Sequence, residues 1–314
     1  MVIKMNQFPY SFDNKRYHTY NYFLKNKYQQ KIAKVSLNAG FTCPNRDGTS
    51  GKGGCIFCSD KGSGDFAGNI YDSLQKQFLD VSSIMRQKWP QCQFIAYFQA
   101  NTNTYADIER LRKTFEPFIN YPEVVGIAIA TRPDCLSEEV CDYLYELSLK
   151  CDLYIELGLQ TIHDTTAQLI NRGHNYQTFL DGLSRLRKRN IDVCVHIING
   201  LPYETYDMML ETAKAVGQLD IQGLKIHNLF MLKNTVLHQL YLQKPFPLMS
   251  RETYISLVVE QLSYIPSHVV IERLTGDAPI NDLVEPLWSI KKVTILNDID
   301  KLMKEKDIYQ GCLL

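Results

Sequence analysis

The chain has 314 residues, of which 45% are hydrophobic and 22% charged, and its 34 basic residues balance 34 acidic ones. This composition is typical of a globular protein with one large domain or two small ones, and its zero net charge points to no polyanionic partner. The first 18 residues contain no apolar stretch of signal-peptide length, and the longest apolar run, residues 124–130, is far short of the ~20 residues of a membrane helix. We therefore expect a cytoplasmic protein without membrane segments, whose nine cysteines are thiols, metal ligands or catalytic groups rather than disulfides.

Short apolar runs, rich in valine, isoleucine and aromatic residues, recur along most of the chain. Such runs, when bounded by turn residues, are typical of buried strands. After the first gap their spacing is roughly thirty residues, which is the length of a strand–helix–strand unit. The predicted strands are residues 31–38, 94–98, 124–130, 153–159, 193–198 and 224–230.

Helical patterns fill the gaps between these runs. Residues 73–89 carry one apolar stripe at helical spacing, formed by Leu74, Phe78, Val81, Met85 and Trp89. A second helix begins after Ser137, a good N-cap, and buries Val140, Leu144 and Leu147. This alternation predicts an α/β fold, best described as a partial (β/α)6 TIM-like barrel, with an open doubly wound sheet as the alternative. In either fold the site lies at the carboxyl ends of the strands.

The remaining segments divide the chain into three parts. We expect an N-terminal extension at residues 1–30, the barrel core at 31–235 and a small C-terminal α/β cap at 236–314. The cap is predicted to contain a helix at about 250–264, a strand at 269–274 and a helix at about 288–305.

An unusual glycine-rich loop follows the first predicted strand. It contains Cys43, Cys55 and Cys58 at C-x11-C-x2-C spacing, and eight of the 17 glycines fall between Gly40 and Gly68. Glycines let a loop fold tightly around a compact object. Three cysteines without an obvious fourth suggest a metal centre with an open position, such as a [4Fe–4S] cluster.

A zinc knuckle is the alternative interpretation of this loop. Structural zinc takes four protein ligands, so the three cysteines would need a fourth. The fourth ligand would then be His18, His163 or His174. The other cysteines lie mostly on apolar stripes and are interpreted as small core residues rather than ligands: Cys92, Cys135, Cys141, Cys151 and Cys194. Cys312, near the end of the sequence, is interpreted as a core residue or a free surface thiol.

The motif GFTCPNRDG…GGCIFC, followed by this barrel pattern, resembles the radical S-adenosylmethionine (SAM) superfamily. More narrowly, the chain is similar to the branch related to the Elongator catalytic subunit and to YhcC/YtqA-type proteins. The cysteine spacing is longer than the superfamily's common C-x3-C-x2-C. The segments that support the resemblance are YFQANTNTY (97–105), ATRPD (130–134), ELGLQT (156–161), NRGHNY (171–176), HIINGLPYET (196–205), KIHNLF (225–230) and ERLTGD (272–277).

The resemblance implies a barrel of radical SAM type with two cofactors, a [4Fe–4S] cluster and SAM. The cluster would be held by Cys43, Cys55 and Cys58, and its reaction with SAM would produce a 5′-deoxyadenosyl radical. The implied SAM-binding residues are Phe57 near the adenine, Asn101 and Thr102 after the second strand, Gln160 after the fourth, and Arg172, whose guanidinium would bind the SAM carboxylate. Backbone groups of residues 198–200 would flank the adenine.

Several charged residues lie on strands that should be buried. Glu156 is expected to point into the barrel, where a carboxylate can hold ribose hydroxyls or a substrate amine, and we assign it a catalytic role. His196, Lys225 and His227 can face inward too, either as functional groups or as satisfied core residues. Arg273 and Asp277 match family positions without a role that we can derive.

Residues 1–60 contain nine basic and three acidic residues, and aromatic residues interleave with the bases in residues 14–28. This stretch can contact phosphates and bases of RNA, or it can simply cap the barrel. The resemblance suggests an enzyme that removes the carboxymethyl group from the 5-aminomethyl side chain of tRNA wobble uridine, with flavodoxin or ferredoxin as examples of an unidentified electron donor. A radical SAM enzyme acting on a small molecule and a zinc-bearing nucleic-acid-binding protein are the alternatives.

Overall fold

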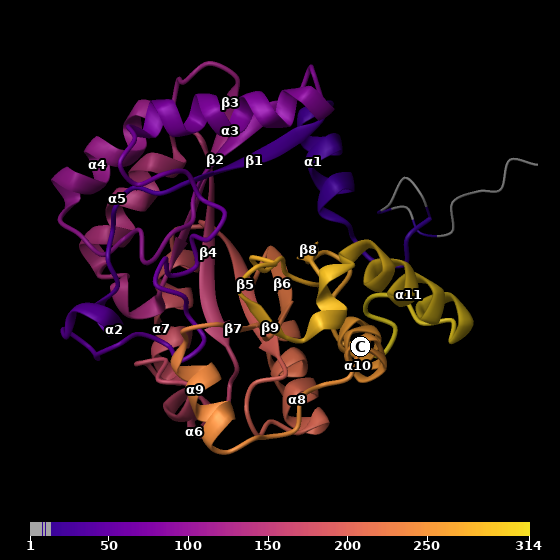
Figure 1. Cartoon of the computed structure of the whole chain (residues 1–314). Coiled ribbons are helices and arrows are strands. Elements are labelled where there is room, and N and C mark those ends of the chain that lie inside the picture. The colour runs from indigo at the N-terminus through magenta and orange to yellow at the C-terminus, as the bar shows by residue number, and fades with distance from the viewer. Residues whose placement is uncertain (1–7, 9, 11–13) are drawn as a thin grey trace, which may run out of the picture.

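A computed structural model describes residues 8, 10 and 14–314, so Lys4 and Asp13, which belong to the basic stretch, lie outside the described residues. Within these residues seven parallel strands form one curved sheet in the spatial order β1-β2-β3-β4-β5-β6-β8. Figure 1 shows helices packed along the outside of this sheet. The strands are β1 (Ile32–Leu37), β2 (Gln93–Phe98), β3 (Val124–Thr131), β4 (Asp152–Gln160), β5 (Asp192–Asn199), β6 (Gly223–Asn228) and β8 (Val270–Arg273).

The helices follow the strands in the expected alternation. They are α1 (Tyr20–Tyr28), α2 (Pro44–Asp47), α3 (Leu74–Lys88), α4 (Ile108–Phe115), α5 (Glu138–Ser148), α6 (Asp164–Leu169), α7 (Tyr176–Arg187), α8 (Tyr206–Gly217), α9 (Val236–Gln243), α10 (Arg251–Ser263) and α11 (Lys292–Glu305). A separate two-stranded antiparallel sheet pairs β7 (Met231–Leu232) with β9 (Leu283–Glu285). No helix in these ranges is long and apolar enough to cross a membrane.

The predicted partial barrel is confirmed, and all six predicted core strands are present within two residues of their expected ends. The predicted helix starts also follow their local chemistry. Ser137 accepts a hydrogen bond from the amide of Val140 and so caps α5, while Phe78 on α3 is 1% exposed and packs in the main core. Periodicity therefore located these elements because burial of one face dominates their sequence.

β8 lies in the main sheet rather than in a separate cap. Its residues pair in parallel with β6, where Val270 is the partner of Gly223. The sequence predicted this strand correctly but placed it in the cap, since nothing local shows which sheet edge a strand will join. The edge of β6 offers unpaired backbone groups, and β8 satisfies them.

Helix α1, which the sequence left inside an extension without clear periodicity, lies close to both β1 and β8. The amide of Ile271 on β8 donates to the carbonyl oxygen of His18 at 2.8 Å. Leu24 of α1 is 5% exposed and packs with Ile32 and Ile95 on the inner face of the sheet. The aromatic residues of the basic stretch thus serve in part as a plug for the barrel, with Tyr20, Phe23 and Tyr28 packed against the same cluster.

Candidate functional site

The cysteine loop lies against the carboxyl end of β2. The amide of Thr102 donates to the carbonyl oxygen of Thr42 at 3.2 Å, directly before Cys43. A Cβ added to Gly64 would lie 2.6 Å from the Cβ of Ala100, so only glycine permits this close approach. Asn101 has a left-handed backbone, with φ of 60°, at this contact.

A pair of asparagines holds the loop on the opposite side. Asn45 donates from Nδ2 to the carbonyl oxygen of Asn171 at 2.5 Å, and Asn171 donates in turn to the carbonyl oxygens of Lys52 (3.0 Å) and Gly54 (2.8 Å). The amide of Ile56 also donates to the carbonyl oxygen of Ile170 at 3.0 Å. The segment just before Arg172 therefore positions the loop that contains all three predicted cluster ligands. Sequence reasoning missed both asparagines, because their pairing spans more than a hundred residues.

The environment of Cys55 favours a thiolate. A hydrogen bond from Cys58, opposed by burial and helped by the positive charge of Arg132, lowers the pKa of Cys55 to about 7. Asn45 Nδ2 lies 3.8 Å from the Cys55 sulfur and is directed at it as a donor. Thiolates are the form in which cysteine binds iron, so Cys55 fits an iron–sulfur cluster, whereas the hydrogen bond to Cys55 and burial raise the pKa of Cys58. Arg132 was also missed, although it follows β3 directly in the ATRPD segment.

The assignment of Cys43, Cys55 and Cys58 as the ligands stays a prediction. No group of three or more His, Cys, Asp or Glu side chains in the described part of the chain is arranged to hold a metal ion. Two histidines proposed for a zinc knuckle are engaged elsewhere: His18 Nδ1 lies 3.1 Å from the carbonyl oxygen of Ser267, and His163 Nε2 lies 2.9 Å from that of Met208.

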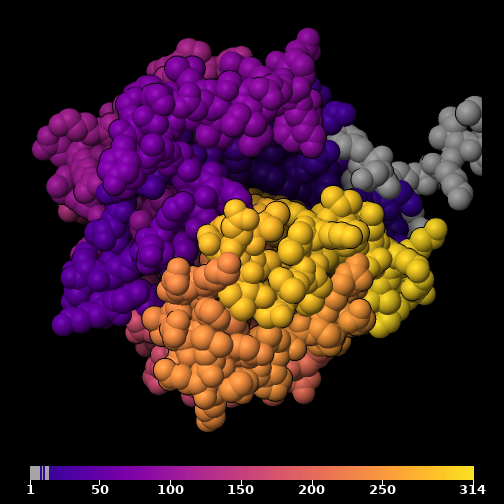
Figure 2. Space-filling view, in the orientation of Figure 1, coloured from indigo at the N-terminus to yellow at the C-terminus, as the bar shows by residue number. Residues whose placement is uncertain are grey.

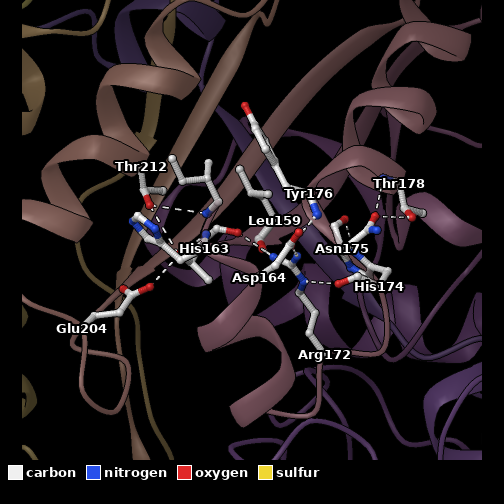
Figure 3. Close-up of polar contacts among 12 residues, drawn as sticks. Leu159, His163, Asp164, Arg172, His174, Asn175, Tyr176, Thr178, Glu204 and Thr212 are labelled. Atoms are coloured by element: carbon white, nitrogen blue, oxygen red, sulfur yellow. Dashed lines mark hydrogen bonds and ion pairs between the residues drawn. The ribbon is translucent and has the colours of Figure 1, made fainter.

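Arg172 clamps the end of β4 (Figure 3). Its Nη1 donates to the carbonyl oxygens of Leu159 at 2.5 Å and Thr161 at 2.6 Å, and its Nε donates to that of His174 at 2.9 Å. The side chain is 1% exposed, and burial lowers its pKa to about 10. Of the three guanidinium nitrogens, only Nη2 makes no hydrogen bond; it lies 3.6 Å from Asp164 Oδ1. For the predicted contact with the SAM carboxylate, only this nitrogen is without a hydrogen bond, and it faces Asp164; the rest of the guanidinium orders this strand end.

Gln160 occupies a bulge at the end of β4. Its φ is 64°, and the register against β5 shifts between Gly158 and Gln160. The side-chain nitrogen Nε2 of Gln160 lies 2.7 Å from the position that a Cβ on Gly158 would occupy, so the Gln160 side chain folds back over that glycine. Phe57 packs partly buried beside Ile56 and Leu201 in a small apolar cluster. The predicted roles of Gln160 and Phe57 in SAM binding are not tested by these contacts.

Glu156 does point into the barrel, and its carboxylate is saturated with partners. Lys34 of β1 lies 2.6 Å from Oε1, while Lys225 of β6 and the Tyr97 hydroxyl of β2 each lie 2.5 Å from Oε2. Burial alone would raise the pKa of Glu156, but attraction by Lys225 and Lys34 outweighs it and holds this pKa well below its usual value. The catalytic role assigned to Glu156 stays a prediction. The pairing itself could have been inferred from the sequence, because a buried carboxylate needs cations and Lys34 alternates inward on its strand.

The comparisons with known proteins agree with this geometry. The radical SAM superfamily model matches residues 42–216, and the radical SAM C-terminal domain matches residues 221–305. This chain belongs to the radical SAM superfamily. It is 50% identical to the uncharacterized protein YtqA of Bacillus subtilis over 310 residues, which cover 99% of this chain and 96% of that protein.

More distant relatives place the chain near the Elongator branch. It is 23% identical to the tRNA uridine(34) acetyltransferase of Methanocaldococcus infernus, over 60% of this chain and 35% of that protein. The solved structure of Methanocaldococcus infernus Elp3 with an N-terminal deletion superposes with a TM-score of 0.66 at 17% identity, covering 90% of this chain and 64% of that one. The latter likeness confirms the shared fold.

Membership of the superfamily gives the cofactors: a [4Fe–4S] cluster and SAM. The zinc-bearing alternative is therefore replaced by iron–sulfur chemistry. The suggestion that the basic stretch forms an RNA-binding face stays a prediction, and three of its cations are engaged in ion pairs. Lys15 pairs with Asp300, Arg16 with Asp307 and Lys27 with Asp152.

Proposed function

We propose that this protein is a radical SAM enzyme that removes the carboxymethyl group from 5-carboxymethylaminomethyluridine at the wobble position of tRNA. The observation that carries the enzymatic part is the cysteine loop fixed across the carboxyl edge of the barrel, where Cys58, Arg132 and Asn45 favour the Cys55 thiolate. The tRNA part rests on the similarity to an archaeal tRNA uridine(34) acetyltransferase.

The residues of this chain would divide the work between cofactor and substrate. Cys43, Cys55 and Cys58 would hold the cluster, and Gln160 and Arg172 would contact SAM at the end of β4. When bound, the cluster and SAM together supply a radical able to abstract hydrogen from an unactivated carbon. The carbon next to the side-chain nitrogen suits this chemistry, because nitrogen stabilises a neighbouring carbon radical. Glu156, held by Lys34 and Lys225, would keep a fixed negative charge inside the barrel beside that space.

A small-molecule amine is the second candidate substrate. The pairing of Lys15, Arg16 and Lys27 with acidic residues favours it, because paired bases contribute little to phosphate binding. Salt dependence separates the candidates: binding that neutralises several phosphates weakens steeply with salt, whereas binding of one zwitterion does not.

The test combines a deletion strain with the purified protein. Anaerobically reconstituted protein, incubated with SAM, reductant and tRNA from the deletion strain, should release 5′-deoxyadenosine and convert 5-carboxymethylaminomethyluridine to 5-aminomethyluridine. Nucleoside analysis by mass spectrometry measures this conversion. Unchanged wobble nucleosides in the deletion strain would reject the tRNA substrate. A colourless reconstituted protein that takes up no iron would reject the enzyme itself.

A further inference from the structure

Four charged side chains alternate around a ring inside the barrel. Lys34 and Lys225 each lie between the carboxylates of Glu156 and Glu272, and we call these four residues the charge ring. Three of its contacts are short: Lys34–Glu156 at 2.6 Å, Lys34–Glu272 at 2.7 Å and Lys225–Glu156 at 2.5 Å. The fourth, between Lys225 Nζ and Glu272 Oε2, is 3.7 Å and too long for a hydrogen bond. The ring is therefore open at one edge.

Stability alone does not account for this ring. The side chains of Glu156, Glu272 and Lys225 are 0%, 6% and 7% exposed, so each has lost most of its hydration. Apolar residues of similar size often stabilise a core as well as or better than buried ion pairs do. Desolvated charges that are incompletely paired bind a complementary ligand strongly, because the cost of removing their water has already been met in folding.

The surroundings of the open edge are polar and unsatisfied. His196 and His227 lie beside Lys225 on β5 and β6, with ring centroids 5.3 Å apart. The Nε2 atoms of both rings are buried without a hydrogen bond, although that of His196 lies 3.0 Å from Glu156. Burial and the charge of Lys225 lower the pKa of both histidines, and Arg273 lowers that of His227 further, so both rings are neutral at pH 7. A neutral imidazole can donate one hydrogen bond from Nε2 to a carboxylate.

A route to the ring exists between the two ends of the chain. A cavity of about 440 Å³ is lined by Glu272 and Arg273 of β8 together with Tyr20 and Asn21 of α1. Figure 2 shows the surface hollowed where indigo N-terminal residues lie behind yellow C-terminal ones. Glu272 therefore faces both this cavity and the charge ring, which puts the open edge within reach of an entering group.

We propose that the open edge of the charge ring binds a secondary amine that carries a carboxymethyl group, with its ammonium on Glu272 and its carboxylate on Lys225 and the two histidines. This inference rests on the proposed function and names the groups that would recognise its substrate. In such an amine the two opposite charges are separated by one carbon, which matches the neighbouring opposite charges of Lys225 and Glu272. Loss of the carboxymethyl group would leave only the ammonium contact, so the ring distinguishes substrate from product.

Binding of three small probes to the reconstituted full-length protein tests this assignment. N-Benzylglycine carries both charges, benzylamine only the ammonium, and 3-phenylpropanoate only the carboxylate. We expect N-benzylglycine to bind at least ~10-fold more tightly than either single-charge probe, as measured by calorimetry. Lys225→Gln should weaken binding of N-benzylglycine and 3-phenylpropanoate by roughly 10-fold or more and leave benzylamine unchanged. Glu272→Gln should weaken binding of N-benzylglycine and benzylamine by a similar factor and leave 3-phenylpropanoate unchanged.

Matched controls separate recognition from stability. Lys76→Gln and Glu211→Gln remove exposed charges of the same types and should change no probe's affinity. If Lys225→Gln fails to fold, Lys225→Arg keeps the charge and should keep the preference for N-benzylglycine. Equal affinity of the wild type for all three probes, absence of binding, or equal losses for all probes in a folded variant would overturn the inference.

The outcome is distinguishable from that of the proposed function. N-Benzylglycine contains no uridine, so its binding reports on the charge ring alone, while nucleoside analysis of the deletion strain reports on tRNA. Charge-selective probe binding with unchanged tRNA would support the ring and reject the tRNA substrate. Altered tRNA without charge-selective probe binding would reject the ring and support the tRNA substrate.

Discussion

Arg132 donates from Nη1 to the backbone carbonyl oxygen of Arg172 at 2.7 Å, and this bond joins the end of β3 to the loop that follows α6. Arg132 also pairs with Asp134 and places its positive charge near Cys55. One side chain thus connects the cysteine loop, the ATRPD segment and the NRGHNY segment, which are far apart in the sequence.

Replacing Arg132 should make Cys55 less reactive. In the iron-free protein, Arg132→Gln removes a charge that lowers the pKa of Cys55, so less thiolate is present at pH 7. We expect alkylation of Cys55 by iodoacetamide, followed by peptide mass spectrometry, to slow by roughly 3- to 10-fold. Arg132→Lys keeps the charge and should retain most of the rate. An unchanged rate in Arg132→Gln would show that this charge does not act on Cys55.

Cys55→Ser should abolish SAM cleavage without unfolding the protein. The substitution removes a thiolate ligand but leaves a small polar side chain in the loop. Reconstituted Cys55→Ser protein should bind less iron, lack the visible absorbance of the cluster and release no 5′-deoxyadenosine above background. Cys312→Ser, near the end of the chain, is the control and should behave like the wild type. Normal SAM cleavage by Cys55→Ser would remove Cys55 from the ligand set.

Gly158→Ala should disturb Gln160 rather than the barrel. The new Cβ would lie 2.7 Å from the side-chain nitrogen Nε2 of Gln160, so the Gln160 side chain must move. If Gln160 binds SAM, Gly158→Ala and Gln160→Ala should each lower the affinity for SAM. The double variant should bind SAM as tightly as the more impaired of the two single variants. Equilibrium binding of SAM to the reconstituted proteins measures this. Strictly additive losses would mean that Gly158 acts independently of Gln160.

Glu156→Gln should destabilise the fold in a pH-dependent way. The substitution leaves Lys34 and Lys225 sharing the single carboxylate of Glu272, and we expect the free energy of unfolding at pH 7 to fall by about 3–5 kcal/mol. Because the folded pKa of Glu156 is lowered, its contribution is present above the unfolded value of about 4.3 and is lost as pH falls further through the folded pKa.

Urea denaturation of both proteins between pH 7 and pH 3 measures this difference. The wild-type advantage should be constant at neutral pH and shrink below about pH 4. Glu211→Gln, at an exposed position, should cost little at any pH. An advantage that grows toward low pH would contradict an ionised Glu156 in the folded state.

The sequence predicted the core strands well, because each is a short apolar run that is buried on both faces. It did not predict that β8 joins the main sheet or that α1 plugs the barrel, since both depend on contacts between the two ends of the chain. At the site, the family motifs located the cysteine loop and the strand ends. They did not reveal that three hydrogen bonds of Arg172 go to backbone carbonyl oxygens, because the sequence does not show whether an arginine is buried or which acceptors surround it. The charge ring was only half visible, since Glu156 and Lys225 were noted but Lys34 and Glu272 were not connected to them.

The joining of α1 to β8 has a consequence for biosynthesis. Gln310 donates from its amide nitrogen to the carbonyl oxygens of Pro266 and Val269, and its backbone amide donates to that of Arg16. The segment before α1 therefore receives its bonds from Ile271 and Gln310 only after most of the chain has been synthesised. Before residues 270–273 have been added, Lys34 and Glu156 lie in a nascent half-barrel that lacks Glu272, and the edges of β1 and β6 are exposed for a chaperone to shield.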